Sequence, residues 1–251
     1  MNFSSEPPAA SPSPSPSVFT RLLRIFTRPA DAWEGIESGS RSWVPLLLIV
    51  AVEVAAMAAT FERALLPDIF ARWDDMVSAG RMEPAQVAML QEGMTSNPAW
   101  RWSTIAAPVY GIPLVTLFTA VLLWAVIGFL LGGRLRFRHA WALAAWTGLV
   151  MIPFSLLRAG LAYAAESYQA VHLGLGVLVP DPETPSKGWT GVTAFLEALS
   201  PFTAWWLVVL VLGASRLSGL SRRKVAIALV ATYLILAAGG ALFAALFSPG
   251  A

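Results

Sequence analysis

Residues 105–131 read IAAPVYGIPLVTLFTAVLLWAVIGFLL, and this stretch contains no Asp, Glu, Lys or Arg. About 20 consecutive apolar residues are enough to cross the hydrocarbon core of a bilayer as one helix. Backbone groups in lipid must find their hydrogen-bond partners within the same segment, which a helix provides and an irregular segment does not. The stretch therefore predicts a membrane-spanning helix.

The ten residues that follow, GGRLRFRHAW (132–141), place Arg134, Arg136 and Arg138 in alternation with apolar side chains. Such a pattern fits a nucleic-acid patch, an edge strand or a short loop between two spans. The segment is too short and too closely flanked by apolar sequence to be a strand, so we interpret its alternation as incidental. We expect a loop whose arginines lie at the membrane surface.

The composition indicates a membrane protein. Of the 251 residues, 57% are apolar and 13% are charged, whereas a globular domain averages about 45–50% apolar and about 25% charged residues. The net charge of +2 gives no argument for a nucleic-acid partner, and none is expected. The chain has no Cys, which excludes disulfides, thiolate metal ligands and cysteine nucleophiles.

Five apolar runs are candidate membrane spans, and four of them carry tryptophan at or near an end, where aromatic belts form. We therefore expect an all-α integral membrane protein with five transmembrane helices. The fourth run is short, and the preceding residues VTAFLEAL (192–199) are expected to extend its helix. The spans are predicted at about residues 44–61, 105–131, 140–165, 197–215 and 225–247.

The N-terminal region divides into a tail and an amphipathic segment. Residues 1–17 are rich in Ser and Pro, which favours an extended, solvated and disordered chain. Residues 18–36 place apolar side chains near helical spacing and arginines elsewhere, which predicts an interfacial helix broken near Pro29. Residues 18–247 are thus expected to form one membrane domain. The apolar set of the amphipathic segment is Phe19, Leu22, Leu23, Phe26, Trp33 and Ile36.

Basic residues are distributed unevenly between alternate loops. Eleven lie before span one and in the loops after spans two and four, against five in the two remaining loops. Because cytoplasmic loops carry the excess of Lys and Arg, the N-terminus is predicted to be cytoplasmic and the C-terminus to lie outside. Six of these residues are candidate contacts for anionic lipid or a partner: Arg134, Arg136, Arg138, Arg222, Arg223 and Lys224.

No residue pattern indicates a catalytic, cofactor-binding or metal site. The chain lacks HExxH, Gly-x-Ser-x-Gly and a phosphate-binding glycine loop, and GLGVL (174–178) lacks the third glycine of a dinucleotide site. The two histidines, His139 and His172, are predicted on opposite sides of the bilayer. We therefore expect a non-enzymatic protein without a cofactor.

Two charged residues, Glu53 and Arg158, fall within predicted spans. A charged Arg, Lys or Asp at a helix centre costs ~2.5–3.5 kcal/mol on insertion scales. A charged residue within a span therefore usually has a structural or functional role. Glu53 lies either on an ion or proton path or is a protonated carboxyl that is hydrogen-bonded inside the bundle. A Glu53–Arg158 pair is disfavoured by a height difference of ~13 Å, and Arg158 has Glu62 and Glu166 as alternative partners.

Three segments resemble bacterial members of the Yip family, the Ypt/Rab-interacting membrane proteins. They are RLLRIFTRPADAWEGI with WVPLLL, LLGGRLRFRHAWALAAWTGLVMIP, and SPFTAWWLVVLVLGASRLSGLSRRKVAI. The resemblance covers about residues 18–247 and implies a Yip-type domain of five spans. The Asp-Leu-Tyr-Gly-Pro-like motif of eukaryotic relatives is absent, and Trp146-Thr147 stands where relatives often have Gly-Tyr, so a Rab partner is not implied.

The expected function is that of a scaffold or partner-binding protein in a bacterial inner membrane. Its expected partners are the lipid bilayer and either another membrane protein or a second copy of the chain. One alternative is a small transporter or channel component that uses Glu53. A further alternative is a lipid-handling or membrane-shaping protein that uses the amphipathic helix.

Overall fold

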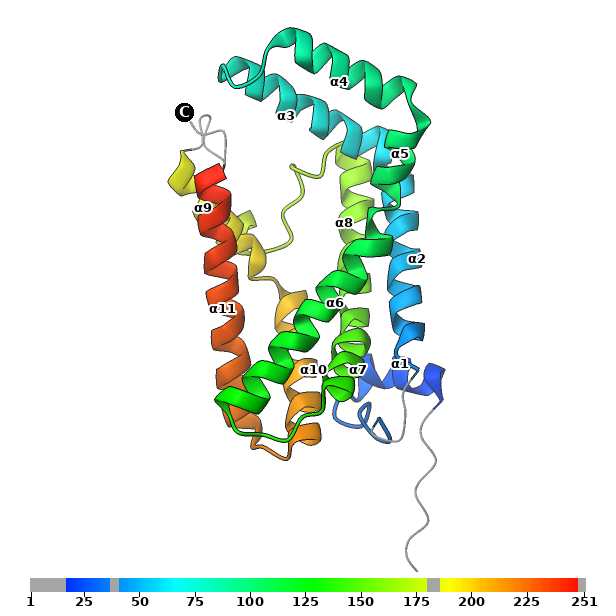
Figure 1. Cartoon of the computed structure of the whole chain (residues 1–251), viewed down its shortest axis with the longest axis vertical. Helices are drawn as coiled ribbons and strands as arrows, with labels where there is room; N and C mark the ends of the chain where they lie inside the picture. Colours follow the sequence, from blue (N-terminus) through cyan, green and yellow to red (C-terminus); the bar gives the residue numbers. More distant parts are fainter. Residues whose placement is uncertain (1–16, 37–40, 180–185, 248–251) are drawn as a thin grey trace, which may run out of the picture.

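The computed structural model describes residues 17–36, 41–179 and 186–247, and these residues form helices, turns and loops without a strand. Five helices are long and apolar enough to cross a membrane, which confirms the predicted fold class. The predicted tail falls outside the described residues except for Ser17. The five long helices extend over Trp43–Ser78, Pro98–Leu130, Phe137–Ala165, Pro201–Ser218 and Arg222–Phe247 (Figure 1).

Several of the long helices are composites of shorter segments. The first continues through a π-helical turn into a second α-helix, and the next two also contain a short π or 3-10 segment. In chain order the segments are α1 (Val18–Thr27), α2 (Trp43–Thr60), η1 (Phe61–Leu65), α3 (Leu66–Ser78), α4 (Pro84–Ser96), α5 (Pro98–Ile105), α6 (Ala107–Ala125), η2 (Val126–Leu130), α7 (Phe137–Gly148), η3 (Leu149–Met151), α8 (Ile152–Ala165), η4 (Leu175–Leu178), α9 (Lys187–Ala198), α10 (Pro201–Ser218) and α11 (Arg222–Phe247).

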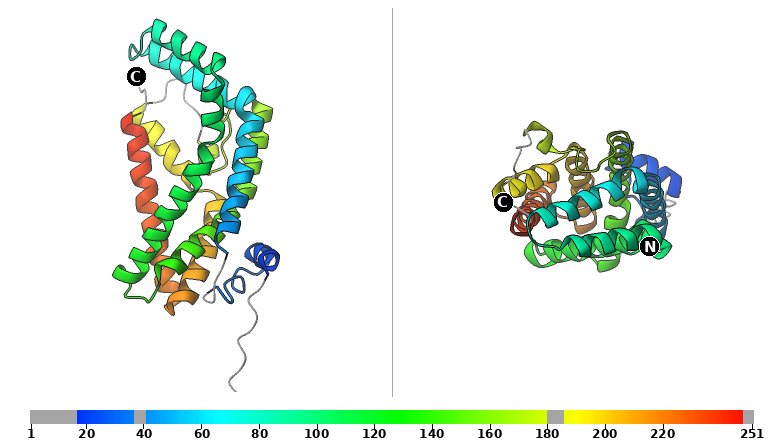
Figure 2. Two further views of the ribbon diagram at one scale, coloured as in Figure 1. Left: turned by 45° about the vertical axis from the view of Figure 1, so that its right-hand side comes forward. Right: turned by 90° about the horizontal axis from the view of Figure 1, so that it is seen from above.

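The two ends of the bundle differ in structure. One end, which we call the basic end, holds α1 and the connections at residues 131–136 and 219–221 (Figure 1). At the other end, which we call the distal end, α3 and α4 lie side by side across the top of the bundle (Figure 2). Since α11 begins at the basic end and finishes at the distal end, α1 and the last described residue lie at opposite ends.

The fourth span begins at Pro201, later than predicted, because α9 and α10 are separate helices. Ser200 adopts an extended conformation before Pro201, and its hydroxyl accepts a hydrogen bond of 3.1 Å from the backbone N–H of Thr203. A residue before proline is disfavoured in the helical region, so the helix of VTAFLEAL stops before α10 begins. The predicted extension of the fourth span is therefore wrong, and α9 packs along α11 instead.

The buried core cluster includes much of α7 and extends to the basic end. Every residue of α7 from Ala142 to Thr147 is buried, and several of them are alanines, which let neighbouring helices approach closely. A Cβ atom on Gly148 would lie 2.9 Å from the side chain of Ile49 on α2. This close packing joins α7 to α2 at the centre of the bundle.

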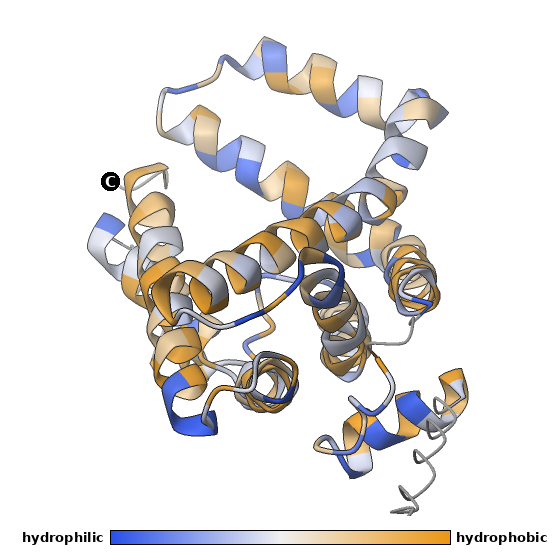
Figure 3. Cartoon of the chain, turned by 60° about the horizontal axis from the view of Figure 1, so that its bottom comes forward, coloured by the Kyte–Doolittle hydropathy of each residue, from blue (hydrophilic) through white to orange (hydrophobic). Residues whose placement is uncertain are grey.

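Apolar residues predominate along the spans (Figure 3), and many of them are exposed. Leu114 and Val115 on α6 are 65% and 64% exposed, and Ile235 on α11 is 71% exposed. A continuous exposed apolar surface of this kind is unfavourable in water and indicates contact with lipid acyl chains. The spans are therefore suited to a bilayer on the outside as well as to packing on the inside.

Candidate functional site

Arg21 attaches α1 to the bundle. It is 3% exposed, and its Nη2 donates a hydrogen bond of 2.8 Å to the backbone carbonyl of Glu34. Its guanidinium carbon lies 5.3 Å from the centre of the Trp146 ring on α7, a cation–π contact. Burial lowers the pKa of Arg21 because it disfavours the charged form, and the nearby Arg24 lowers it further. The predicted placement of Arg21 away from the packed face is wrong.

Trp33 makes a second attachment, between the turn after α1 and α10. It is 1% exposed and lies against Gly213. A Cβ atom on Gly213 would lie 2.7 Å from the Trp33 ring and would also clash with the side chain of Leu143. The turn therefore depends on the absence of a side chain at position 213.

The apolar residues of α1 divide between two faces. Ile25 is fully buried in the core, and Leu22 packs against the core. Phe19, Leu23 and Phe26 lie on the other face and are 74%, 53% and 38% exposed. The predicted single apolar stripe is thus corrected: one part packs on the bundle, and an exposed ridge of Phe19, Leu23 and Phe26 fits the boundary between headgroups and acyl chains.

All six predicted contact residues are exposed at the basic end. Arg134, Arg136 and Arg138 surround the connection into α7, and the other three form the first turn of α11. None of the six forms an ion pair with a described residue. Two described acids, Asp31 and Glu34, lie in the turn after α1. Glu34 pairs with Arg24 at 3.0 Å and lies 3.8 Å from a nitrogen of Arg216, so neither acid forms an ion pair with any of the six residues.

The alternating pattern around Arg134 has a structural role that the sequence interpretation missed. Leu135 is 5% exposed and belongs to the core, whereas Arg134 and Arg136 are exposed. Arg136, which precedes α7, has an extended backbone, and burial alternates from Arg134 to Arg136. The alternation is therefore not incidental: it fixes the connection to the bundle and directs the arginines outward.

Glu53 lies in the membrane-spanning part of α2 and accepts a hydrogen bond from the hydroxyl of Ser155 on α8. It also lines a cavity of about 330 Å³ between α2, α6, α7, α10 and α11. The polar residues around this cavity come from α6, α10 and α11 and are Thr116, Thr119, Thr203 and Tyr233. Glu53 thus has a hydrogen-bond partner and faces a partly polar space between helices.

Arg158 does not pair with Glu53 or with either alternative acid. Its guanidinium carbon lies 5.4 Å from the centre of the Tyr168 ring. Glu62 pairs with Arg101 at 2.7 Å, and Glu166 pairs with Arg63 at 3.0 Å. The predicted ion-pair partners of Arg158 are therefore engaged elsewhere, and the arginine lies beside a second, larger cavity at the distal end.

Sequence reasoning missed Arg21 and the polar residues of the Glu53 cavity. The four-residue spacing of Arg21 and Ile25 places them on one helical face, a signal that could have indicated burial of Arg21. The threonines of the cavity gave a weaker signal, because a threonine inside a span can bond its own helix, as Thr119 does with the carbonyl of Val115 at 2.9 Å. Within the described ranges, no group of three His, Asp or Glu side chains is placed to hold a metal ion.

The fold and these sites define a class: a multi-pass helical membrane protein with an N-terminal helix docked on one end of its bundle. The chain belongs to the Yip1-domain family, since the Yip1 domain matches residues 23–245. The match runs from α1 into α11 and so includes parts of all five spans. Neither a curated protein nor a solved structure matches the chain.

Proposed function

We propose that this protein is a non-enzymatic scaffold of a bacterial inner membrane, whose basic end binds an acidic segment of a membrane protein partner. One observation carries the proposal: α1 is fixed to the bundle through Arg21, and six basic side chains without a described acidic partner lie at the same end of the bundle. A fixed surface binds with a smaller loss of conformational entropy than a mobile segment does.

The bilayer supports this surface in the same proposal. Each Lys or Arg near an anionic membrane contributes ~1 kcal/mol of attraction, and the ridge of Phe19, Leu23 and Phe26 adds apolar contact. The basic end would thus face the cytoplasm, with the N-terminus inside and the C-terminus outside. The positive-inside distribution of the loops supports this orientation.

Crosslinking in intact cells tests the scaffold proposal. A photoreactive residue in place of Phe137, next to the basic connection, should capture a protein partner. Replacing Arg134, Arg136 and Arg138 by Gln should remove the captured band. The matched control replaces three exposed arginines of the distal end, Arg63, Arg81 and Arg101, and should keep the band. Capture that does not depend on either set of charges would overturn the proposal.

A labelling experiment tests the orientation independently. Because the chain has no Cys, a single cysteine can be introduced at one position at a time. In intact cells, a membrane-impermeant maleimide should modify Arg81→Cys at the distal end. It should modify Arg136→Cys only after the membrane is permeabilised. The opposite pattern would reverse the orientation.

The Glu53 cavity favours a second candidate function, that of a small transporter or channel component. The cavity lies within the spans and combines one carboxyl group with several hydroxyl groups, which suit a proton or a small cation. Flux into liposomes that Glu53→Gln abolishes, and that the basic-end variant leaves unchanged, would support this function over the scaffold. Liposomes without flux would exclude it.

A further inference from the structure

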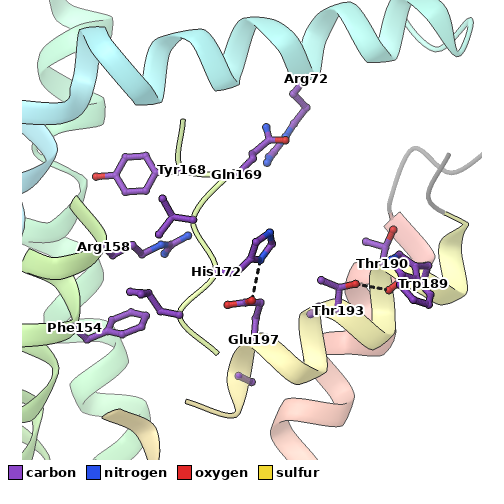
Figure 4. A pocket seen from close by; sticks show the side chains of 14 residues that line it. Arg72, Phe154, Arg158, Tyr168, Gln169, His172, Trp189, Thr190, Thr193 and Glu197 are labelled. Carbon is purple, nitrogen blue, oxygen red and sulfur yellow. Dashed lines mark hydrogen bonds and ion pairs between the residues drawn. The ribbon is translucent and has the colours of Figure 1, made fainter. Parts of the chain in front are cut away.

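The distal end contains a cavity of about 760 Å³ that no part of the proposed scaffold function uses. It lies between α8 and α9, beneath α3, and the segment of residues 168–173 runs along it (Figure 4). Sites for small molecules are typically about 300–1,000 Å³, so the space can take a ligand. We call this cavity the distal vestibule.

One wall of the vestibule is fixed by Asp68 of α3. Its carboxylate accepts a hydrogen bond of 2.7 Å from the hydroxyl of Ser167 and another of 2.7 Å from the backbone N–H of Tyr168. The hydroxyl of Tyr168 in turn lies 2.7 Å from that of Thr60. These contacts hold the Tyr168 ring beside Arg158, so the position of the Arg158 guanidinium is built into the fold.

The opposite wall is fixed by Glu197 of α9. One oxygen of its carboxylate lies 2.9 Å from Nδ1 of His172, and the other accepts a hydrogen bond of 3.2 Å from the backbone N–H of Gly174. A Cβ atom on Gly174 or Gly176 would overlap atoms of Glu197, which explains the glycines of the GLGVL stretch. Both carboxylate oxygens are thus engaged by these groups, and Glu197 forms no ion pair with Arg72 or Arg158 among the described residues.

Two arginines supply positive charge to the vestibule. In Figure 4, Arg158 points from α8 toward the space beside His172 and Glu197, and Arg72 comes from α3 above it. Neither arginine forms a hydrogen bond or ion pair with a described residue. Arg158 makes a cation–π contact with the Tyr168 ring. Arginine presents planar N–H donors that match the oxygens of a phosphate or carboxylate.

The remaining surface of the vestibule is mostly apolar. Phe154 on α8, Val171 and Leu173 on the connecting segment, and Trp189 on α9 line it, and all four are half-buried. Phe154 lies within a membrane-spanning helix, so the apolar surface continues toward the depth of the acyl chains. A ligand that fits both parts carries an anionic group at one end and an alkyl chain at the other.

We propose that the distal vestibule binds an anionic phospholipid, with its phosphate between Arg72 and Arg158 and part of an acyl chain against Phe154 and Leu173. A soluble organic phosphate shares the anionic chemistry but leaves the apolar surface uncovered. A zwitterionic lipid covers that surface, but its added positive charge opposes the two arginines. The chemistry of the vestibule therefore selects the anionic lipid.

Photolabelling of the full chain in nanodiscs tests this inference. The probe is phosphatidylglycerol with a diazirine on one acyl chain, and modified residues are mapped by mass spectrometry. Labelling should occur on residues 168–173, and the Arg72→Gln, Arg158→Gln double variant should reduce it about tenfold or more, since charge-assisted hydrogen bonds are the strong ones. Labelling at the basic end should persist in the same variant and serves as the internal control.

Three controls separate the alternatives. The Arg81→Gln, Arg101→Gln double variant removes an equal charge outside the vestibule lining and should leave labelling of residues 168–173 unchanged. Phosphatidylcholine with the same diazirine chain should label this segment weakly, and millimolar glycerol phosphate should not displace the lipid. Equal labelling by phosphatidylcholine, full displacement by glycerol phosphate, or undiminished labelling of the double variant would each overturn the proposal. None of these outcomes depends on a protein partner at the basic end.

Discussion

The guanidinium carbon of Arg21 lies 5.3 Å from the centre of the Trp146 ring. This contact joins a helix outside the spans to the most buried helix within them. A charged group at such a position is costly unless it is paired and hydrogen-bonded. Arg21 has a carbonyl acceptor for Nη2 and an aromatic face, whereas its Nε has no hydrogen-bond partner among the described residues. The N-terminal helix is therefore part of the folded bundle.

Arg21→Ala should destabilise the protein by about 1–3 kcal/mol, because the Glu34 carbonyl loses its donor and the Trp146 ring loses its neighbour. Arg24→Ala, on the same helix, removes an exposed ion pair and should cost about 1 kcal/mol or less. Unfolding of the detergent-solubilised full chain, followed by circular dichroism, measures both. Equal stability of the two variants would contradict the role assigned to Arg21.

Gly213→Ala should destabilise the protein by about 1–3 kcal/mol, since a Cβ atom would press on Trp33 and Leu143 in a packed core. Gly239→Ala on α11 is the matched control, because its added Cβ atom would meet no atom within 4 Å. The control should change stability by about 1 kcal/mol or less. Thermal melting of the two variants in one detergent measures the difference in stability. Equal melting temperatures would contradict the role assigned to Gly213.

Ser155→Ala should cost about 1 kcal/mol, because it removes the hydrogen bond from α8 to Glu53 on α2. Glu53→Gln keeps an acceptor at the same place and should be milder. In a double-mutant cycle with Glu53→Ala, the two alanine substitutions should not be additive. Additive effects on the free energy of unfolding would show that the two side chains do not interact in the membrane.

Cysteines placed on α1 should report the position of its exposed ridge. Leu23→Cys should react slowly with a water-soluble maleimide in liposomes, because the ridge lies among lipid headgroups. Arg28→Cys, exposed after the end of α1, should react rapidly in the same liposomes. Similar rates at both positions would place the ridge in water.

Much of the membrane architecture follows from local sequence. The uncharged run at residues 105–131 predicts a span by its length alone, and the structure has a helix over Pro98–Leu130 there. Hydropathy alone does not predict where the fourth span begins. It favours a continuous helix from VTAFLEAL into the next helix, whereas Pro201 restricts the backbone of Ser200 and separates α9 from α10.

The candidate sites could be predicted only in part from the sequence. The sequence singled out Glu53 and Arg158 because charges in an apolar run are conspicuous. It could not supply Ser155 as the donor to Glu53, or Tyr168 as the neighbour of Arg158, because these contacts join different elements. The burial of Arg21 was missed for the same reason, since its aromatic partner lies 125 positions away in the chain.

By itself, the sequence determined that this chain has five spans, basic loops at alternate connections and an amphipathic N-terminal segment. The length of an apolar run and the positions of charges can be read directly from the sequence. Apolar runs that cross lipid form helices, because their backbone groups must bond within the segment. Only the tertiary structure decided that α1 is docked through Arg21, that Glu53 faces a cavity, and that Arg72 and Arg158 share the distal vestibule. These relationships depend on how helices pack across the bundle, which the order of residues within each helix does not specify.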